Sequence, residues 1–282
     1  MWQALLSYPF LQYALAAGLL ASVACGVVGS LVVARRITYL AGAVAHAVLG
    51  GMGAARYLQV VHGITWLTPL TGALAAALAA AGVMGLVSLK ARQREDTVIG
   101  AIWAVGMAVG ILFIAATPGY SADLMGYLFG NILMVTPGNL GLMAGLDAVV
   151  LLLGLVFFKQ LLAVCFDEEF AETRGLPVQW LYLLLLGLTA LTVVLLVSVV
   201  GIVLVIALLT LPAAIAGHLA RRLATIMVLA VAASMLITSG GLALSYRADW
   251  PAGATIAALA GAAYLATALG ARLLAWHRRR AA

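Results

Sequence analysis

Charged residues are scarce: Asp, Glu, Lys and Arg make up only 9% of the 282 residues. Soluble domains carry about 25% charged residues, so the composition excludes an ordinary soluble domain. Hydrophobic residues make up 66% of the chain. Apolar runs of about 20 residues, the length that crosses a bilayer as a helix, recur from end to end. The sequence therefore predicts an all-α, polytopic helical membrane protein, and we expect residues 1–282 to form a single transmembrane domain.

Cysteine pairs and common catalytic motifs are also missing. Cys25 and Cys165 are far apart in sequence, which predicts two free thiols rather than a disulfide or a thiolate metal site. The chain has no Gly-x-x-x-x-Gly-Lys-Ser/Thr loop, no His-Glu-x-x-His and no Gly-x-Ser-x-Gly. We therefore expect no enzyme activity and no bound cofactor. In a membrane protein the net charge of +6 reports orientation, so no nucleic-acid partner is expected.

Nine apolar runs are candidate membrane spans. They lie at about residues 11–34, 38–57, 66–89, 98–116, 140–158, 178–197, 199–216, 224–245 and 252–276. Basic residues gather in alternate connections, at Arg35-Arg36, Lys90 to Arg94, Lys159, Arg221-Arg222 and the C-terminus. The positive-inside rule places these connections in the cytoplasm and the N-terminus outside. Eight spans remain possible if residues 1–34 are re-entrant or two later segments merge.

Two connections stand out within this pattern. Residues 120–137 are too polar for a clear span and too apolar for a free loop, so we expect an interfacial or re-entrant segment. A hinge is expected near Ser198 and Gly201, where the spans at 178–197 and 199–216 meet.

The most acidic stretch, residues 166–177, holds four of the nine acidic residues between two apolar runs. It reads as a short cytoplasmic helix, because acidic residues fill its first turn, where the helix dipole favours negative charge. Gly175 and Pro177 are typical of a helix end. Phe166 and Phe170 are four residues apart and should share one face. The pattern fits either a docking element with exposed aromatics or an ordinary solvated connecting helix.

Two ionisable residues are expected at membrane depth. His46 lies near the middle of the second span, where an ionisable group is a functional candidate and imidazole is a common zinc ligand. The alternative for His46 is a hydrogen bond across a helix interface. Asp147 could face a water-filled path, pair with a basic group or lie nearer the outer surface.

Several sequence runs together resemble one family, the ABC-3 membrane permeases, which serve bacterial uptake of zinc, manganese and iron. The resemblance covers essentially the whole chain. The matching runs are Ala-His-Ala at 45–47, Glu-Asp-Thr-Val-Ile-Gly at 95–100, the aromatic and Asn-Gly pattern of 120–133, the acidic stretch 166–177 and Leu-Pro-Ala-Ala at 211–214.

The resemblance implies a permease subunit of an ATP-driven importer in the bacterial inner or plasma membrane. Such a permease works as a homodimer with two separate ATPase subunits and an extracytoplasmic metal-binding protein. A cytoplasmic coupling helix, at about residues 166–177 here, docks in a groove of the ATPase. The resemblance assigns that docking to five positions: Asp167, Glu169, Phe170, Glu172 and Gly175.

The same resemblance places His46 on the metal path. Many family members carry Gly-Asp-x-x-x-His in this helix, but Gly42 occupies the Asp position here. Because carboxylates suit manganese and imidazole suits zinc, we expect zinc, with manganese or iron as the alternative cargo. A different class also stays open, an ATP-independent channel or secondary transporter that would use His46 and Asp147 near the midplane.

Overall fold

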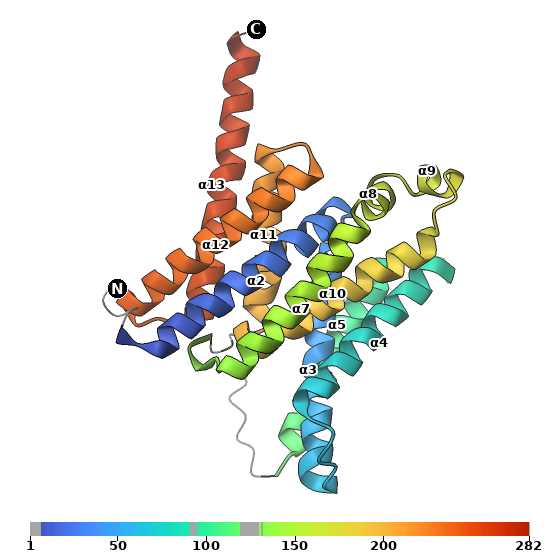
Figure 1. Cartoon of the computed structure of the whole chain (residues 1–282), viewed down its shortest axis with the longest axis vertical. Coiled ribbons are helices and arrows are strands. Elements are labelled where there is room, and N and C mark those ends of the chain that lie inside the picture. Colours follow the sequence, from blue (N-terminus) through green and yellow to red (C-terminus); the bar gives the residue numbers. More distant parts are fainter. Residues whose placement is uncertain (1–6, 91–94, 119–129, 131, 282) are drawn as a thin grey trace.

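The computed structural model describes residues 7–90, 95–118, 130 and 132–281 (Figure 1). Within these residues every regular element is a helix, as the sequence predicts. In chain order the elements are α2 (Pro9–Ala34), α3 (Thr38–His62), α4 (Pro69–Lys90), α5 (Glu95–Ala116), the 3-10 turn η1 (Ile132–Met134), α7 (Pro137–Val156), α8 (Phe158–Phe166), α9 (Glu168–Thr173), α10 (Val178–Val200), α11 (Ile202–Leu219), α12 (Leu223–Ala248) and α13 (Ala252–Ala281).

Counting only the described residues, nine helices are long and apolar enough to cross a bilayer. This number equals the larger of the two predicted counts. Some predicted boundaries were wrong: α3 continues to His62, and α7 ends at Val156, after which α8 begins with Phe158. Lys159 therefore lies inside α8 rather than at the end of a span. The stretch expected to be interfacial or re-entrant lies mostly outside the described residues.

Helix α2 packs against α7, α10, α11 and α12, and small residues line its contact with α12 (Figure 1). A Cβ atom on Gly26 would lie 2.6 Å from the backbone nitrogen of Val231, so the two helices touch backbone to backbone. Ser22 donates a hydrogen bond to the Gly18 carbonyl, and its hydroxyl lies 3.4 Å from that of Thr238. Small residues permit such close packing between membrane helices, where lipid gives no hydrophobic drive for association.

A second group consists of α3, α4 and α5, and α10 contacts both this group and α2. Within this group α3 also packs closely against α5. A Cβ atom on Gly106 would lie 2.7 Å from the Cα atom of Ala47, and one on Gly50 would lie 2.9 Å from the Gly106 carbonyl oxygen. Because these contacts are backbone to backbone, the surroundings of the neighbouring His46 are tightly fixed.

The predicted hinge between the sixth and seventh spans is found at Gly201. This residue has φ 81° and ψ 164° and separates α10 from α11. A positive φ of this kind is readily available to glycine but costly for other residues. The chain therefore reverses direction here with a single residue between two helices (Figure 1).

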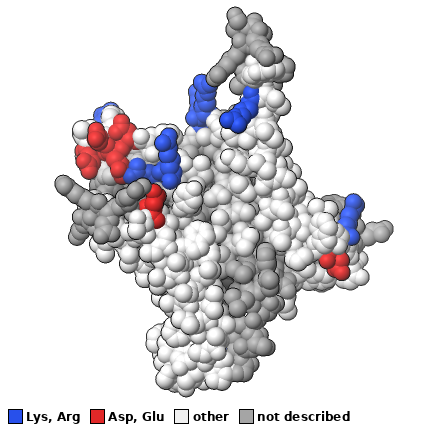
Figure 2. Space-filling view, turned by 180° about the vertical axis from the view of Figure 1, so that it is seen from behind, with Lys and Arg blue, Asp and Glu red and all other residues white. Residues whose placement is uncertain are grey.

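On the face shown in Figure 2, most charged side chains lie in the upper part, above a broad uncharged body, and a smaller group lies at the right-hand side. The upper end carries α8, α9, the end of α2 and the α11–α12 connection (Figure 1). Its connections include Arg35-Arg36, Lys159 and Arg221-Arg222, so the positive-inside rule assigns it to the cytoplasm. We refer to it as the cytoplasmic end.

Candidate functional site

His46 lies in α3 and is buried, with 7% of its surface exposed. It lies eight positions after Thr38 at the helix start, about 12 Å from the cytoplasmic end of α3, which is nearer to that end than the predicted midpoint of the span. Its Nδ1 atom lies 2.8 Å from the Gly42 carbonyl oxygen. Because a carbonyl can only accept, Nδ1 carries the proton and donates. In the neutral ring Nε2 then keeps its lone pair, which is the arrangement of a metal ligand held by a backbone hydrogen bond.

Trp103 of α5 fills the space beside this histidine. The His46 and Trp103 rings are stacked, with centroids 4.5 Å apart and 25° between their planes. A Cβ atom on Gly42 would lie 2.3 Å from Trp103 Cζ3. The indole thus occupies the place into which an Asp side chain at position 42 would project. Sequence reasoning noted the missing Asp but missed Trp103, since nothing in the α5 sequence marks that indole as a neighbour of His46.

Asp147 lies midway along α7 and is buried, with 3% of its surface exposed. One sequence alternative is wrong, because a residue midway along α7 is not near the outer surface. No ion pair joins Asp147 to a basic residue that the structure describes. Neither carboxyl oxygen has a hydrogen-bond partner among the described residues. The third alternative, a role on a water-filled path, stays a prediction.

The acidic stretch forms a shorter helix than predicted. Asp167 has extended backbone angles, φ −154° and ψ 97°, and divides α8 from α9. Its carboxylate accepts a hydrogen bond of 2.9 Å from the Phe170 backbone N–H, which makes it the N-cap of α9. Phe166 therefore ends α8 rather than sharing a helical face with Phe170. The predicted stop is confirmed, since Gly175 has φ 74°.

One face of helix α9 is buried against the membrane domain, and the opposite face is exposed. Ala171 is fully buried and packs in a small apolar cluster with residues of α8 and α10, including Val164 and Leu181. Glu169, Glu172 and Phe170 are exposed, the phenylalanine by 51%. Helix α9 thus presents an exposed aromatic side chain beside carboxylates while its other face packs on the membrane domain. A protein partner can bind such a surface.

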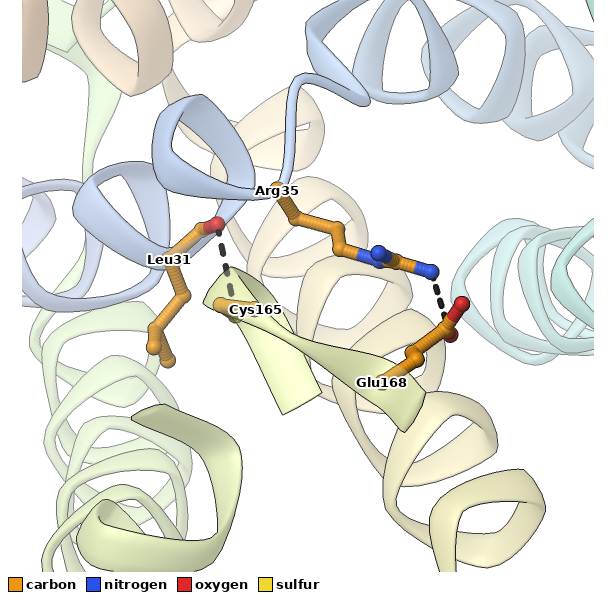
Figure 3. A network of polar contacts seen from close by, with 4 residues as sticks. All are labelled: Leu31, Arg35, Cys165 and Glu168. Atoms are coloured by element: carbon orange, nitrogen blue, oxygen red, sulfur yellow. Dashed lines mark hydrogen bonds and ion pairs between the residues drawn. The ribbon is translucent and has the colours of Figure 1, made fainter. Parts of the chain in front are cut away.

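A polar contact ties the start of α9 to the end of α2 (Figure 3). Arg35 follows α2 and forms an ion pair with Glu168, and its guanidinium carbon lies 5.6 Å from the centre of the Tyr182 ring on α10. Next to it the Cys165 thiol lies 3.9 Å from the Leu31 carbonyl oxygen. Burial raises the pKa of Cys165 to about 11, although the Arg35 charge lowers it in part. Sequence reasoning gave Arg35 only a topological role and missed this link.

The described residues contain no group of three or more His, Cys, Asp or Glu side chains that could hold a metal ion. Both cysteines are buried free thiols. The surroundings of His46 therefore differ from a closed structural metal site, which has four ligands, and its role as a metal ligand stays a prediction. The part of the family-like pattern at residues 120–129 lies outside the described residues.

Comparison with known proteins gives a consistent family. Residues 7–271 match the model of the ABC 3 transport family. A protein of Chlamydia pneumoniae named probable metal transport system membrane protein is 39% identical over 89% of this chain and 85% of its own length. The manganese transport system membrane protein MntC of Halalkalibacterium halodurans is 34% identical over 91% of this chain and 85% of its own.

A solved structure shares the fold as well as the sequence. PsaBC from Streptococcus pneumoniae, solved in complex with Fab, has a chain that is 32% identical and superposes with a TM-score of 0.82, covering 94% of this chain and 93% of that one. The sequence and the fold of this chain therefore both have relatives over most of its length. This multi-pass membrane protein belongs to the ABC 3 transport family.

Proposed function

We propose that this chain is the membrane-spanning permease subunit of an ATP-driven importer for a divalent transition-metal ion. The observation that carries the proposal is helix α9, which is seated on the membrane domain and presents Glu169, Phe170 and Glu172 outward. Relatives named as metal transport system membrane proteins support the cargo class. ATP hydrolysis would come from a separate ATPase subunit, because the chain has no phosphate-binding loop.

The contacts suggest how a movement of the ATPase would reach the metal path. A partner docked on α9 pulls on Glu168, and the ion pair passes that force to Arg35. Arg35 lies in the short connection between α2 and α3, and α3 carries His46. A displacement of α9 therefore shifts the start of the helix that bears the metal ligand. The energy of ATP hydrolysis can drive transport only through contacts that differ between two conformational states of the importer. Helix α9 must therefore bind its partner more tightly in one of these states.

His46 would touch the ion in transit through Nε2. One imidazole binds a passing ion weakly, which suits transport because a tightly held ion would not leave. Imidazole without a neighbouring carboxylate favours zinc, which we propose as the cargo. Manganese is the second candidate, and the relatives named for manganese transport favour it. As in the family, we propose a homodimer that works with an extracytoplasmic metal-binding protein.

The test is metal accumulation in cells that lack this chain and are complemented with it or with a variant. Wild type should restore zinc, and Phe170→Asp should not, because a charge replaces the exposed aromatic on α9. A matched control is Leu219→Asp, which places the same charge on another exposed apolar residue at the end of α11, outside the acidic stretch. Equal uptake with wild type and Phe170→Asp, with both chains in the membrane, would contradict docking through α9.

An ATP-independent channel or secondary transporter is the competing class, and buried Asp147 is the observation that favours it. Purification of the chain from its own cells separates the two. A co-purifying ATPase with a phosphate-binding loop supports the importer. Uptake that continues after the cells are depleted of ATP but stops with a proton uncoupler would contradict it.

A further inference from the structure

A hollow of about 630 Å³ lies at the cytoplasmic end, between α8, α9 and the α11–α12 connection. Three cationic side chains line it: Lys159, Arg221 and Arg222. All three are exposed, and none forms an ion pair with a described residue. The one acid in the lining is Asp167, whose carboxylate already caps α9. The mouth of the hollow therefore carries three cations and one carboxylate, which leaves it with a net positive charge.

A second hollow of about 420 Å³ adjoins the first, and the two share Phe158 and Ala224 as lining residues. Its lining is wholly apolar and comes from the membrane spans α2, α7 and α12. The other residues that line it are Val27, Gly154, Leu155, Met227, Val228 and Val231. These residues lie toward the cytoplasmic ends of their helices, at the depth of the inner leaflet. The two hollows together run from a cationic mouth into an apolar channel along the membrane domain.

This combination has the shape and chemistry of a phospholipid. Lysine and arginine clusters on the cytoplasmic side of membrane helices attract anionic headgroups. An acyl chain requires an apolar surface that continues from the headgroup into the bilayer, which the second hollow offers. We propose that this groove binds one anionic phospholipid of the cytoplasmic leaflet, with its phosphate at Lys159, Arg221 and Arg222 and one acyl chain beside Gly154.

The position and chemistry of this groove favour a lipid over a protein. In a two-fold dimer that used this patch on both copies, the three cations would face their own equivalents and repel them. An ATPase subunit in the cytoplasm would reach the cationic mouth but not the apolar part at bilayer depth. Asp167 and Phe170 also line the mouth, so the lipid would lie next to the docking surface proposed for the ATPase. The inference does not depend on metal transport, because it needs only the membrane orientation and the groove itself.

The experiment is native mass spectrometry of the purified full chain with added phosphatidylglycerol or phosphatidylcholine of equal chain length. One variant combines Lys159→Gln, Arg221→Gln and Arg222→Gln, and its control is Arg247→Gln at the other end of α12. The second variant is Gly154→Leu, with Gly154→Ala as its control. A Cβ atom on Gly154 would lie 3.5 Å from Val27, an ordinary contact, so Ala fits and the larger Leu fills the apolar hollow.

Wild type should retain one phosphatidylglycerol per chain with at least about tenfold preference over phosphatidylcholine, since each basic residue near an anionic lipid contributes about fivefold. The triple variant should lose this preference, Gly154→Leu should retain less of either lipid, and both controls should match wild type. Equal retention of the two lipids by wild type would overturn the proposal. A triple variant that keeps the preference for phosphatidylglycerol would also overturn the proposal. A Gly154→Leu chain that no longer forms a homodimer but still retains lipid would do the same.

Discussion

Restoring the family carboxylate at position 42 tests the account of the metal site in detail. In Gly42→Asp the new Cβ atom would lie 2.3 Å from Trp103 Cζ3 and 2.7 Å from Cη2. Carbon atoms in contact are normally about 3.5–4.0 Å apart, so the indole must retreat by about 1 Å or more. That movement also disturbs the stack with His46. The variant should therefore be destabilised.

The size of the effect follows from the two disturbed contacts. Overpacking of a tight core costs about 1–3 kcal/mol, and loss of a stacked aromatic pair adds about 0.5–1.5 kcal/mol. For a chain of this size, a total of about 2–4 kcal/mol lowers the midpoint of thermal unfolding by roughly 5–15 °C. Trp103→Ala removes the clashing ring, so Gly42→Asp should cost much less in that background.

The assay is thermal unfolding of the purified chain in detergent, followed by metal accumulation in complemented cells. Gly42→Ala is the matched control, because it brings the same clash without a carboxylate. In the Trp103→Ala background, Gly42→Asp should shift the cargo preference from zinc toward manganese, whereas Gly42→Ala should not. An unchanged unfolding midpoint in Gly42→Asp alone would refute the claim that Trp103 fills the carboxylate position.

Three further results follow from the structure. Asp147→Leu should raise the unfolding midpoint by several degrees, because an unpaired buried polar group costs about 1–3 kcal/mol. If Asp147 serves the metal path, the same variant should lower metal uptake. A lower unfolding midpoint would point to a partner of Asp147 outside the described residues. Glu168→Gln should reduce metal-stimulated ATP hydrolysis by the assembled importer. Thermal unfolding of the variant should change little, since Arg35 and Glu168 are 24% and 40% exposed and such pairs contribute about 0.2–1 kcal/mol. Normal ATP hydrolysis would contradict transmission through this ion pair. In a Cys25→Ala background, maleimide labelling of Cys165 should be slow at pH 8, and its rate should rise as the pH approaches about 11. The reason is that the reactive thiolate forms only near the raised pKa. Rapid labelling with a rate that levels off near pH 9 would show that the thiol is not buried.

The membrane fold was predictable because it depends on local composition. An apolar run of sufficient length must form a helix in a bilayer, so eight or nine spans could be predicted from hydropathy, and the described residues contain nine candidates. The left-handed end at Gly175 was predictable for the same reason, since a glycine before Leu-Pro is a local signal.

The details of the site depend on contacts between helices, which periodicity does not encode. Asp167 could be read as part of an acidic helix or as its cap, and only the extended backbone at that residue separates Phe166 from Phe170. Trp103 and His46 are 57 positions apart in sequence, and their stacking follows from the close backbone packing of α3 and α5. The ion pair between Arg35 and Glu168 likewise depends on how α2 packs against α8.

The most direct test of the account is transport by the purified importer in proteoliposomes, with radioactive zinc outside and ATP supplied on the ATPase side. Wild type should accumulate zinc only when ATP and the metal-binding protein are present. His46→Ala should lose most of this accumulation while the assembled complex still hydrolyses ATP. Full zinc transport by His46→Ala, or wild-type transport without ATP, would contradict an ATP-driven importer whose metal path runs past this histidine.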